Sequence, residues 1–148
     1  MKLDLFLVIA QIGIILCYAL DPGWYSWDLP LWLRYLALID LVLGILILLA
    51  GLFTLGDNLT PLPRPKTNGE LVTHGVYRFI RHPLYAGILF GMAGGSIYLA
   101  SGWKLFFTLL IWLLFYLKTE REENYLTDRF PDYEEYKRNT GRFLPKIG

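Results

Sequence analysis

Four long apolar runs constrain the fold of this chain more than any other feature. They cover Leu3–Leu20, Leu31–Leu55, Pro83–Ala100 and Trp103–Leu117. Eighteen helical residues rise about 27 Å, close to the thickness of the hydrocarbon core of a bilayer. Backbone polar groups inside a bilayer must be bonded within the protein, and a helix satisfies its own. We therefore predict an all-α, multi-pass membrane protein with four transmembrane helices, folded as a single domain over residues 1–148.

The connecting segments have the composition expected at a membrane surface. Aromatic residues typical of an interfacial belt follow the first run, after Asp21-Pro22-Gly23. Gly56–Arg81 is polar and rich in proline, glycine and asparagine, so its irregular backbone must lie outside the lipid or over protein. Pro131–Arg138 opens with proline and is followed by Asn139-Thr140-Gly141, which is typical of a short helix and its stop. We predict that this C-terminal helix is cytosolic.

The distribution of basic residues predicts the orientation. Most of them lie at the amino terminus, in the Gly56–Arg81 connector and in the tail after residue 117. Four spans place these three segments on one face, which the positive-inside rule makes cytoplasmic. Both termini and the polar clusters described below are therefore expected in the cytosol. The net charge of +1, with no basic run interleaved with aromatic residues, gives no reason to invoke nucleic acid as a partner.

Several residues inside the runs have simple interpretations. Cys17 is the only cysteine and is expected to be a small core residue, which leaves no disulfide framework. His74 and His82 are too far apart for one helix face, and no metal-ligand spacing occurs. Asp40 lies near the middle of the second run, where a carboxylate is costly, and we expect it to hydrogen-bond to Gln11 or Tyr18.

Small residues recur every four positions along one face of the third run. They are Gly87, Gly91 and Gly95. Small residues at this spacing let two helix backbones approach closely, so we predict that this face packs against another helix. The nearby Gly91–Gly95 segment lacks the spacing and the preceding strand of a dinucleotide fingerprint.

A first polar cluster, Thr73–Tyr85, leads into the third run. Proline is favoured at the first position of a helix, so His82-Pro83 predicts a helix start, whose free N–H groups attract an anion. Arg78 and Arg81 would add positive charge, and the nearby tyrosines would add flat rings. Such a site suits a zwitterionic ligand with one anionic end and one aromatic end. The alternative is a positive-inside flank with interfacial tyrosines.

A second polar cluster, Lys118–Glu123, follows the fourth run. Lys118 and Glu122 are four residues apart on one helix face. If exposed, they form a solvated salt bridge; if the third and fourth helices pack together, they face His82. Glu122 and Glu123 point about 100° apart, so they are not a matched acid–base pair. Two such clusters at the same ends of neighbouring helices predict a shared pocket, and therefore an enzyme.

These residues resemble the membrane methyltransferase superfamily that includes isoprenylcysteine carboxyl methyltransferases and phospholipid N-methyltransferases. The resemblance extends from about Gly56 to Pro145, whereas the first two spans carry little of it. Its specific parts are Leu71-Val72-Thr73-His74-Gly75-Val76-Tyr77, Arg81-His82-Pro83-Leu84-Tyr85-Ala86-Gly87, Glu122-Glu123-x-x-Leu126, Phe130, Tyr133, Tyr136 and Phe143-Leu144-Pro145.

The resemblance implies S-adenosylmethionine as cofactor and a lipophilic methyl acceptor that enters sideways from the bilayer. The acceptor could be a prenylated cysteine, a phospholipid amine, a thiol or another lipophile. Residues 1–55 would then form the first two spans and residues 56–148 the cofactor-binding core. The implied cofactor contacts are Gly69, Glu70, Leu71, Val72, Tyr77, His82, Pro83, Leu84, Tyr85, Lys118 and Glu122. The candidate catalytic residues are Arg81 and Glu123; if the acceptor is an amine, Glu123 or a tyrosine would be the base that deprotonates it.

Two other functions compete with this hypothesis. A sterol-type membrane reductase also has an Arg-His-Pro-like turn and a tyrosine-rich tail, and would bind NADPH. Its later motif usually has Arg-Asp and a cysteine, where this chain has Arg121-Glu122-Glu123 and Leu126. A non-enzymatic membrane adaptor would explain the apolar runs and their basic flanks, but not the co-occurrence of the two polar clusters.

Overall fold

The computed structural model describes residues 2–23, 25–60 and 69–146 as an all-helical chain. The elements are α1 (Lys2–Ala19), α2 (Leu31–Leu55), the 3₁₀ turns η1 (Gly56–Asn58) and η2 (Gly75–Arg78), α3 (Pro83–Tyr98), α4 (Gly102–Arg129) and α5 (Tyr133–Asn139). The described residues form no strand, only isolated bridges between Ser26 and Ser101 and between Ile80 and Gly141. The prediction of an all-α fold is confirmed.

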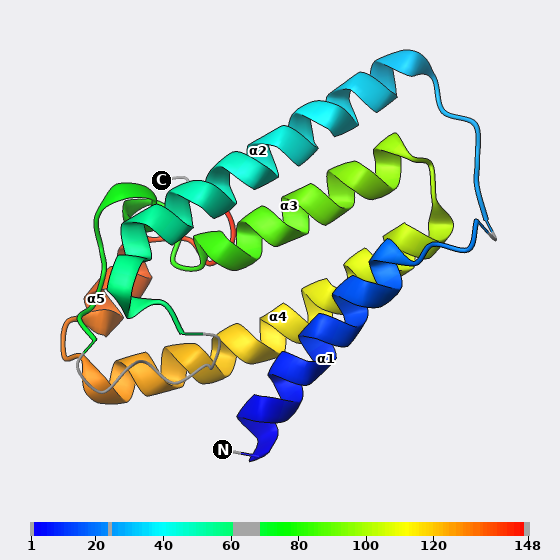
Figure 1. The fold of residues 1–148 in the computed structure, drawn as a ribbon. Coiled ribbons are helices and arrows are strands. Elements are labelled where there is room, and N and C mark those ends of the chain that lie inside the picture. The colour runs from blue at the N-terminus through cyan, green and yellow to red at the C-terminus, as the bar shows by residue number, and fades with distance from the viewer. Residues whose placement is uncertain (1, 24, 61–68, 147–148) are drawn as a thin grey trace.

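The long helices lie side by side in the order α2, α3, α4, α1 (Figure 1). Helix α3 therefore contacts α2 on one side and α4 on the other, whereas α1 contacts α4. Helix α5, residues 69–74 and residues 140–146 gather at one end of the bundle (Figure 1).

Within the part of the chain that the structure describes, three helices are long and apolar enough to cross a membrane: α1, α2 with its η1 extension, and α4. Helix α3 has 16 residues, fewer than the apolar run Pro83–Ala100. It ends at Tyr98 because Ala100 adopts a positive φ of 50° and Ser101 then caps α4, accepting a hydrogen bond from the backbone N–H of Lys104. Helix α4 continues to Arg129, beyond Leu117 where the apolar run ends. This extension carries the second polar cluster, Lys118–Glu123.

Glycines allow α2 and α3 to pack backbone to backbone. A Cβ added to Gly44 would lie 2.4 Å from the backbone nitrogen of Gly91, and one added to Gly87 would lie 2.6 Å from that of Leu48. A Cβ added to Gly94 would lie 2.5 Å from the carbonyl oxygen of Ala37 in α2. The predicted glycine packing is confirmed for Gly87, and the backbone of Gly91 receives the close approach of Gly44. A Cβ added to Gly91 itself would meet nothing within 4 Å, and one added to Gly95 would lie 2.5 Å from the Tyr18 hydroxyl of α1.

Polar groups join α1 to α4 at the end of the bundle remote from α5. Nζ of Lys104 donates to the carbonyl oxygen of Tyr18 at 2.8 Å, and the indole of Trp103 donates to that of Cys17 at 2.7 Å. These carbonyls belong to the last turn of α1, which has no partner for them within the helix. Cys17 itself is half-buried beside this contact rather than enclosed in the core.

The prediction for Asp40 is wrong. Gln11 instead accepts a hydrogen bond from Lys118, and the Tyr18 hydroxyl donates to the carbonyl oxygen of Met92. Asp40 makes no hydrogen bond or ion pair to any of the described residues and is half-exposed on α2. The helix order explains this, because α1 packs against α4 and does not reach the face of α2 that carries Asp40.

Candidate functional site

The Arg81-His82-Pro83 turn begins α3 and is held in place by the C-terminal segment. Pro83 occupies the first helical position, where its missing N–H costs nothing. The backbone N–H of Arg81 donates to the carbonyl oxygen of Gly141 at 2.8 Å, and that of His82 donates to Arg142 at 3.1 Å. Gly141 and Arg142, far from the turn in the sequence, thereby fix the backbone of Arg81 and His82.

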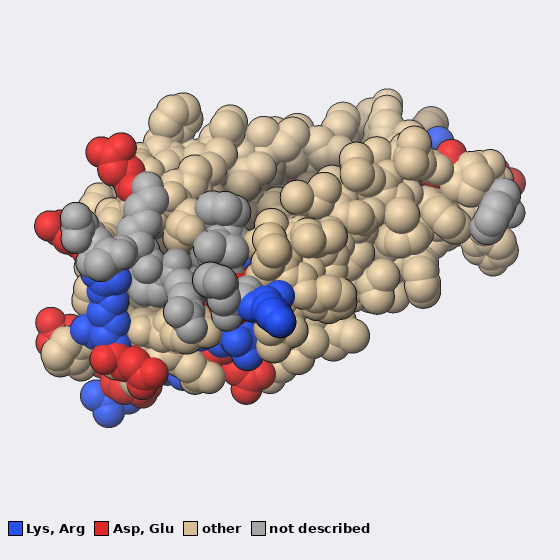
Figure 2. All heavy atoms as spheres, turned by 60° about the horizontal axis from the view of Figure 1, so that its bottom comes forward, with Lys and Arg blue, Asp and Glu red and all other residues tan. Residues whose placement is uncertain are grey.

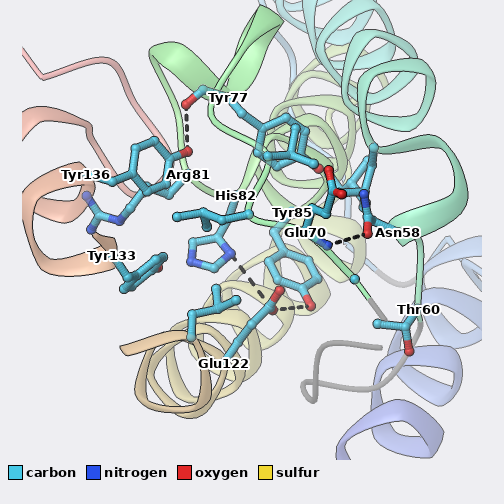
Figure 3. A pocket seen from close by; sticks show the side chains of 16 residues that line it. Asn58, Thr60, Glu70, Tyr77, Arg81, His82, Tyr85, Glu122, Tyr133 and Tyr136 are labelled. Atoms are coloured by element: carbon cyan, nitrogen blue, oxygen red, sulfur yellow. Dashed lines mark hydrogen bonds and ion pairs between the residues drawn. The ribbon is translucent and has the colours of Figure 1, made fainter. Parts of the chain in front are cut away.

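Glu122 of α4 faces this turn, as the sequence predicts. Its Oε2 accepts a hydrogen bond from the Tyr85 hydroxyl at 3.0 Å and lies 3.8 Å from Nδ1 of His82 (Figure 3). The rings of His82 and Tyr85 stack with centroids 5.7 Å apart, and Tyr85 packs on Phe115 at 4.6 Å. Because about a quarter of the Glu122 side chain (27%) is exposed, its carboxylate is open to a ligand.

Glu123 points away from Glu122 into a cluster of basic groups. Its Oε1 lies 3.0 Å from Nε of Arg81 and 3.2 Å from Nε2 of His82. Its Oε2 lies 3.3 Å from both Nζ of Lys137 and Nη2 of Arg142. The Glu123 side chain is only 1% exposed, a position tolerable for a charge only with several partners.

A cavity opens between the Arg81-His82-Pro83 turn, the part of α4 that carries Glu122 and Leu126, and α5 (Figure 3). The predicted cofactor contacts that line it are Gly69, Glu70, Leu71, Val72, Tyr77, His82, Leu84, Tyr85 and Glu122. The structure thus brings together two distant parts of the sequence around one space. Pro83 and Lys118 do not line it.

Lys118 turns away from the cavity. Its Nζ donates to Oε1 of Gln11 at 2.7 Å and lies 5.2 Å from the ring centroid of Tyr85. Lys118 is 2% exposed, and its ammonium lies over the Tyr85 ring. Lys118 therefore supports the cavity wall, and a direct contact with the cofactor stays a prediction.

Of the two arginines expected to add positive charge at the site, only Arg81 lines the cavity. Arg78 is exposed on the surface and does not line it. Arg81 lines it, but its guanidinium bonds to Glu123 and to the carbonyl oxygens of Lys137 and Thr140 at the end of α5. Arg81 thus caps α5 and fixes it against the turn. Catalytic roles for Arg81 and Glu123 stay predictions, and Glu123 does not line the cavity.

Residues outside the predicted contact set complete the cavity. They are Leu55, Asn58, Thr60, Leu126, Tyr133 and Tyr136. Asn58 accepts a hydrogen bond from the backbone N–H of Glu70 at 3.0 Å, and the Tyr136 hydroxyl donates to the carbonyl oxygen of Tyr77 at 2.6 Å (Figure 3). The Phe130, Tyr133 and Tyr136 spacing was the available signal for α5, whereas no pattern in the sequence marks Asn58.

The tyrosines of the cavity remain neutral hydrogen-bond donors at neutral pH. Burial raises the pKa of Tyr136 to about 12. Burial, followed by the negative charge of Glu122, raises the pKa of Tyr77 well above 10, and burial with the charge of Glu123 does the same for Tyr133. The cavity therefore combines the carboxylates of Glu70 and Glu122, the Arg81 guanidinium, neutral phenols and apolar leucines. No group of three or more His, Cys, Asp or Glu residues in the described ranges could hold a metal ion.

Comparison with known proteins gives a family and a fold. The family model described as phospholipid methyltransferase matches residues 32–133. A probable protein-S-isoprenylcysteine O-methyltransferase of Oryza sativa subsp. indica is 33% identical over 117 residues, covering 76% of this chain and 61% of the relative. The protein-S-isoprenylcysteine O-methyltransferase of Homo sapiens is 32% identical over 120 residues, covering 78% of this chain and 42% of the relative.

A solved structure has the same arrangement of helices. It is that of the eukaryotic intramembrane Ras methyltransferase, isoprenylcysteine carboxyl methyltransferase, with a TM-score of 0.70 and 27% sequence identity. The match covers 94% of this chain and 52% of the solved one. The chain thus spans about three fifths or less of the length of these relatives.

Proposed function

Because the chain belongs to the phospholipid methyltransferase family, we propose that it is an integral membrane enzyme that transfers a methyl group from S-adenosylmethionine to a lipophilic acceptor. One observation carries the proposal: His82, at the start of α3, and Glu122, on α4, wall the same cavity, with 3.8 Å between Nδ1 and Oε2. The residues that line this cavity fit the proposed cofactor in chemical type. Glu122 would accept an amino group, while tyrosine rings and leucines would hold an aromatic base.

S-adenosylmethionine supplies a methyl group on a sulfonium, which needs an aligned nucleophile and little other assistance. The contribution of the protein is then to position the two reactants, which can supply several kcal/mol of the barrier. The tyrosine rings and leucines make part of the cavity lining apolar. A carboxylate acceptor would need no base, whereas an amine would have to lose a proton first.

The surface supports a membrane-spanning arrangement in which α3 is the fourth span. Charged residues gather at the end of the molecule that holds the cavity, and a broad uncharged zone separates them from the few charges at the other end (Figure 2). Helix α3 reaches about 24 Å, which suffices because α2 and α4 cover it on both sides. With the positive-inside rule, the charged end, both termini and the cavity face the cytosol.

The names of the relatives favour a prenylated cysteine as the acceptor, with the cofactor entering from the cytosol and the lipid chain from the bilayer. In this proposal residues 1–148 form one domain, and residues 56–148 supply most of the cofactor site. A reductase is not favoured, because the matching relatives and the solved structure are methyltransferases.

Thermal unfolding of the detergent-solubilised protein tests the cofactor. S-adenosylmethionine should raise the unfolding temperature and NADPH should not; the reverse result would indicate a reductase, and no shift with either would favour an adaptor. An acceptor screen with radiolabelled methyl donor should then compare a farnesylated cysteine, a phospholipid amine and native lipid extract. Label in an organic-soluble product is the result expected.

A further inference from the structure

Glu123 fixes the protonation pattern of the His82 ring. Cationic nitrogens lie within 3.3 Å of the Glu123 carboxylate oxygens and belong to Arg81, Lys137 and Arg142. Nearby positive charges favour the ionised form of a carboxylate. An ionised carboxylate can only accept hydrogen bonds. Since Nε2 of His82 lies 3.2 Å from Oε1 of Glu123, Nε2 must carry the proton. In the neutral ring, Nδ1 is then bare.

The unprotonated Nδ1 of His82 faces Glu122, and both residues form part of the cavity wall. Nδ1 and Oε2 of Glu122 are 3.8 Å apart, too far for a hydrogen bond, and both are acceptors. Two acceptors at this separation repel each other unless a donor lies near both. An ammonium group has three donors and a positive charge, and it can satisfy both at once. Oε2 of Glu122 is already oriented by the Tyr85 hydroxyl.

We propose that Glu123 is a positioning residue, which holds His82 in the Nε2–H tautomer and so presents Nδ1 and Glu122 as a paired acceptor for the amino group of the methyl donor. The identity of the ligand rests on the proposed function, whereas the tautomer does not. The charged and titratable groups around His82, Glu122 and Glu123 include Arg81, Tyr85, Lys118, Tyr133, Tyr136, Lys137 and Arg142.

Nitrogen NMR of the imidazole tests the tautomer without any ligand. The chain has two histidines, and the side chain of His74 is exposed, so His74→Asn leaves His82 as the only signal. In the neutral ring we expect a protonated Nε2 and an unprotonated Nδ1. Glu123→Gln should shift both signals toward a mixture of tautomers, and Glu120→Gln, one turn earlier on the exposed face, should shift neither. A protonated Nδ1, or signals unchanged in Glu123→Gln, would overturn the assignment.

Binding of two ligands separates positioning from general loss of structure. Glu123→Gln should weaken S-adenosylmethionine about tenfold, the scale of one charge-assisted hydrogen bond, but should weaken an analogue without the amino group less than about twofold. Equal weakening of both would contradict the positioning role. If Glu123→Gln does not fold, the tautomer of the His74→Asn protein still decides the assignment. The expected tautomer without any donor binding would overturn the proposed function and the ligand assignment, and leave the role of Glu123 toward His82 standing.

Discussion

The hydroxyl of Tyr85 donates a hydrogen bond to Oε2 of Glu122 at 3.0 Å, across the contact between α3 and α4. Because the Tyr85 ring also stacks on His82, one side chain sets the positions of both residues that define the cavity. The cavity wall therefore depends on contacts between α3 and α4, and substitutions at its individual residues test these contacts one at a time.

Tyr85→Phe keeps the ring and removes only the hydroxyl. Glu122 should then lose its orientation, and binding of S-adenosylmethionine should weaken about tenfold, as expected for a hydrogen bond to a charged group. Tyr35→Phe on exposed α2 surface is the matched control and should bind as the wild type does. Unchanged affinity in Tyr85→Phe would mean that Glu122 does not need this bond.

Gly44→Ala should loosen the contact between α2 and α3. The new methyl group would lie 2.4 Å from a backbone nitrogen, which cannot rotate away, so we expect a loss of about 1–3 kcal/mol in unfolding free energy. Gly13→Ala is the control, since nothing lies within 4 Å of its added Cβ, and it should be neutral or gain up to about 1 kcal/mol. Unfolding in mixed detergent micelles measures both, and equal stability of the two variants would refute the packing argument.

Lys104→Met should destabilise the contact between α1 and α4. The variant loses the donor to the Tyr18 carbonyl and the cation 4.4 Å from the Tyr18 ring centroid, at a cost of about 1–2 kcal/mol. Lys2→Met removes an exposed lysine of α1 and should change stability little. The same micelle titration compares them.

Stability should fall at alkaline pH through the buried tyrosines. In the folded protein the pKa of Tyr136 is raised from 10 to about 12, so the folded state holds its proton more tightly than the unfolded chain. That contribution is complete below pH 10 and is lost as the pH rises toward 12. The unfolding temperature of Tyr136→Phe should therefore decline less steeply between pH 9 and 11 than that of the wild type. Parallel declines would show that Tyr136 ionises alike in both states.

Much of the fold could be predicted because a chain inside a bilayer must bond its backbone polar groups internally, which a helix does. Runs of apolar residues indicate the helices, and proline or glycine marks where several begin or end. The approach of His82 to Glu122 followed from their places at the same ends of adjacent helices. The sequence does not show, however, which helix packs beside which.

The parts of the site that the sequence did not reveal depend on helix packing or on the path of the connector. Lys118 shares a helix face with Glu122, but its long side chain reaches Gln11 because α1 lies beside α4. Arg81 lines the cavity, and its guanidinium also donates to carbonyl oxygens at the end of α5, a contact that no pattern in the sequence indicates. Asn58 reaches the cavity through a hydrogen bond to the Glu70 backbone, which depends on the path of a connector without periodicity.

Titration calorimetry with S-adenosylmethionine on the detergent-solubilised protein tests the central claim most directly. The wild type and Glu120→Gln should bind about one equivalent with equal affinity, whereas His82→Ala and Glu122→Ala should show no measurable heat while still inserting into membranes. Wild-type affinity in both of these variants, or no binding by the wild type itself, would contradict the assignment of this cavity.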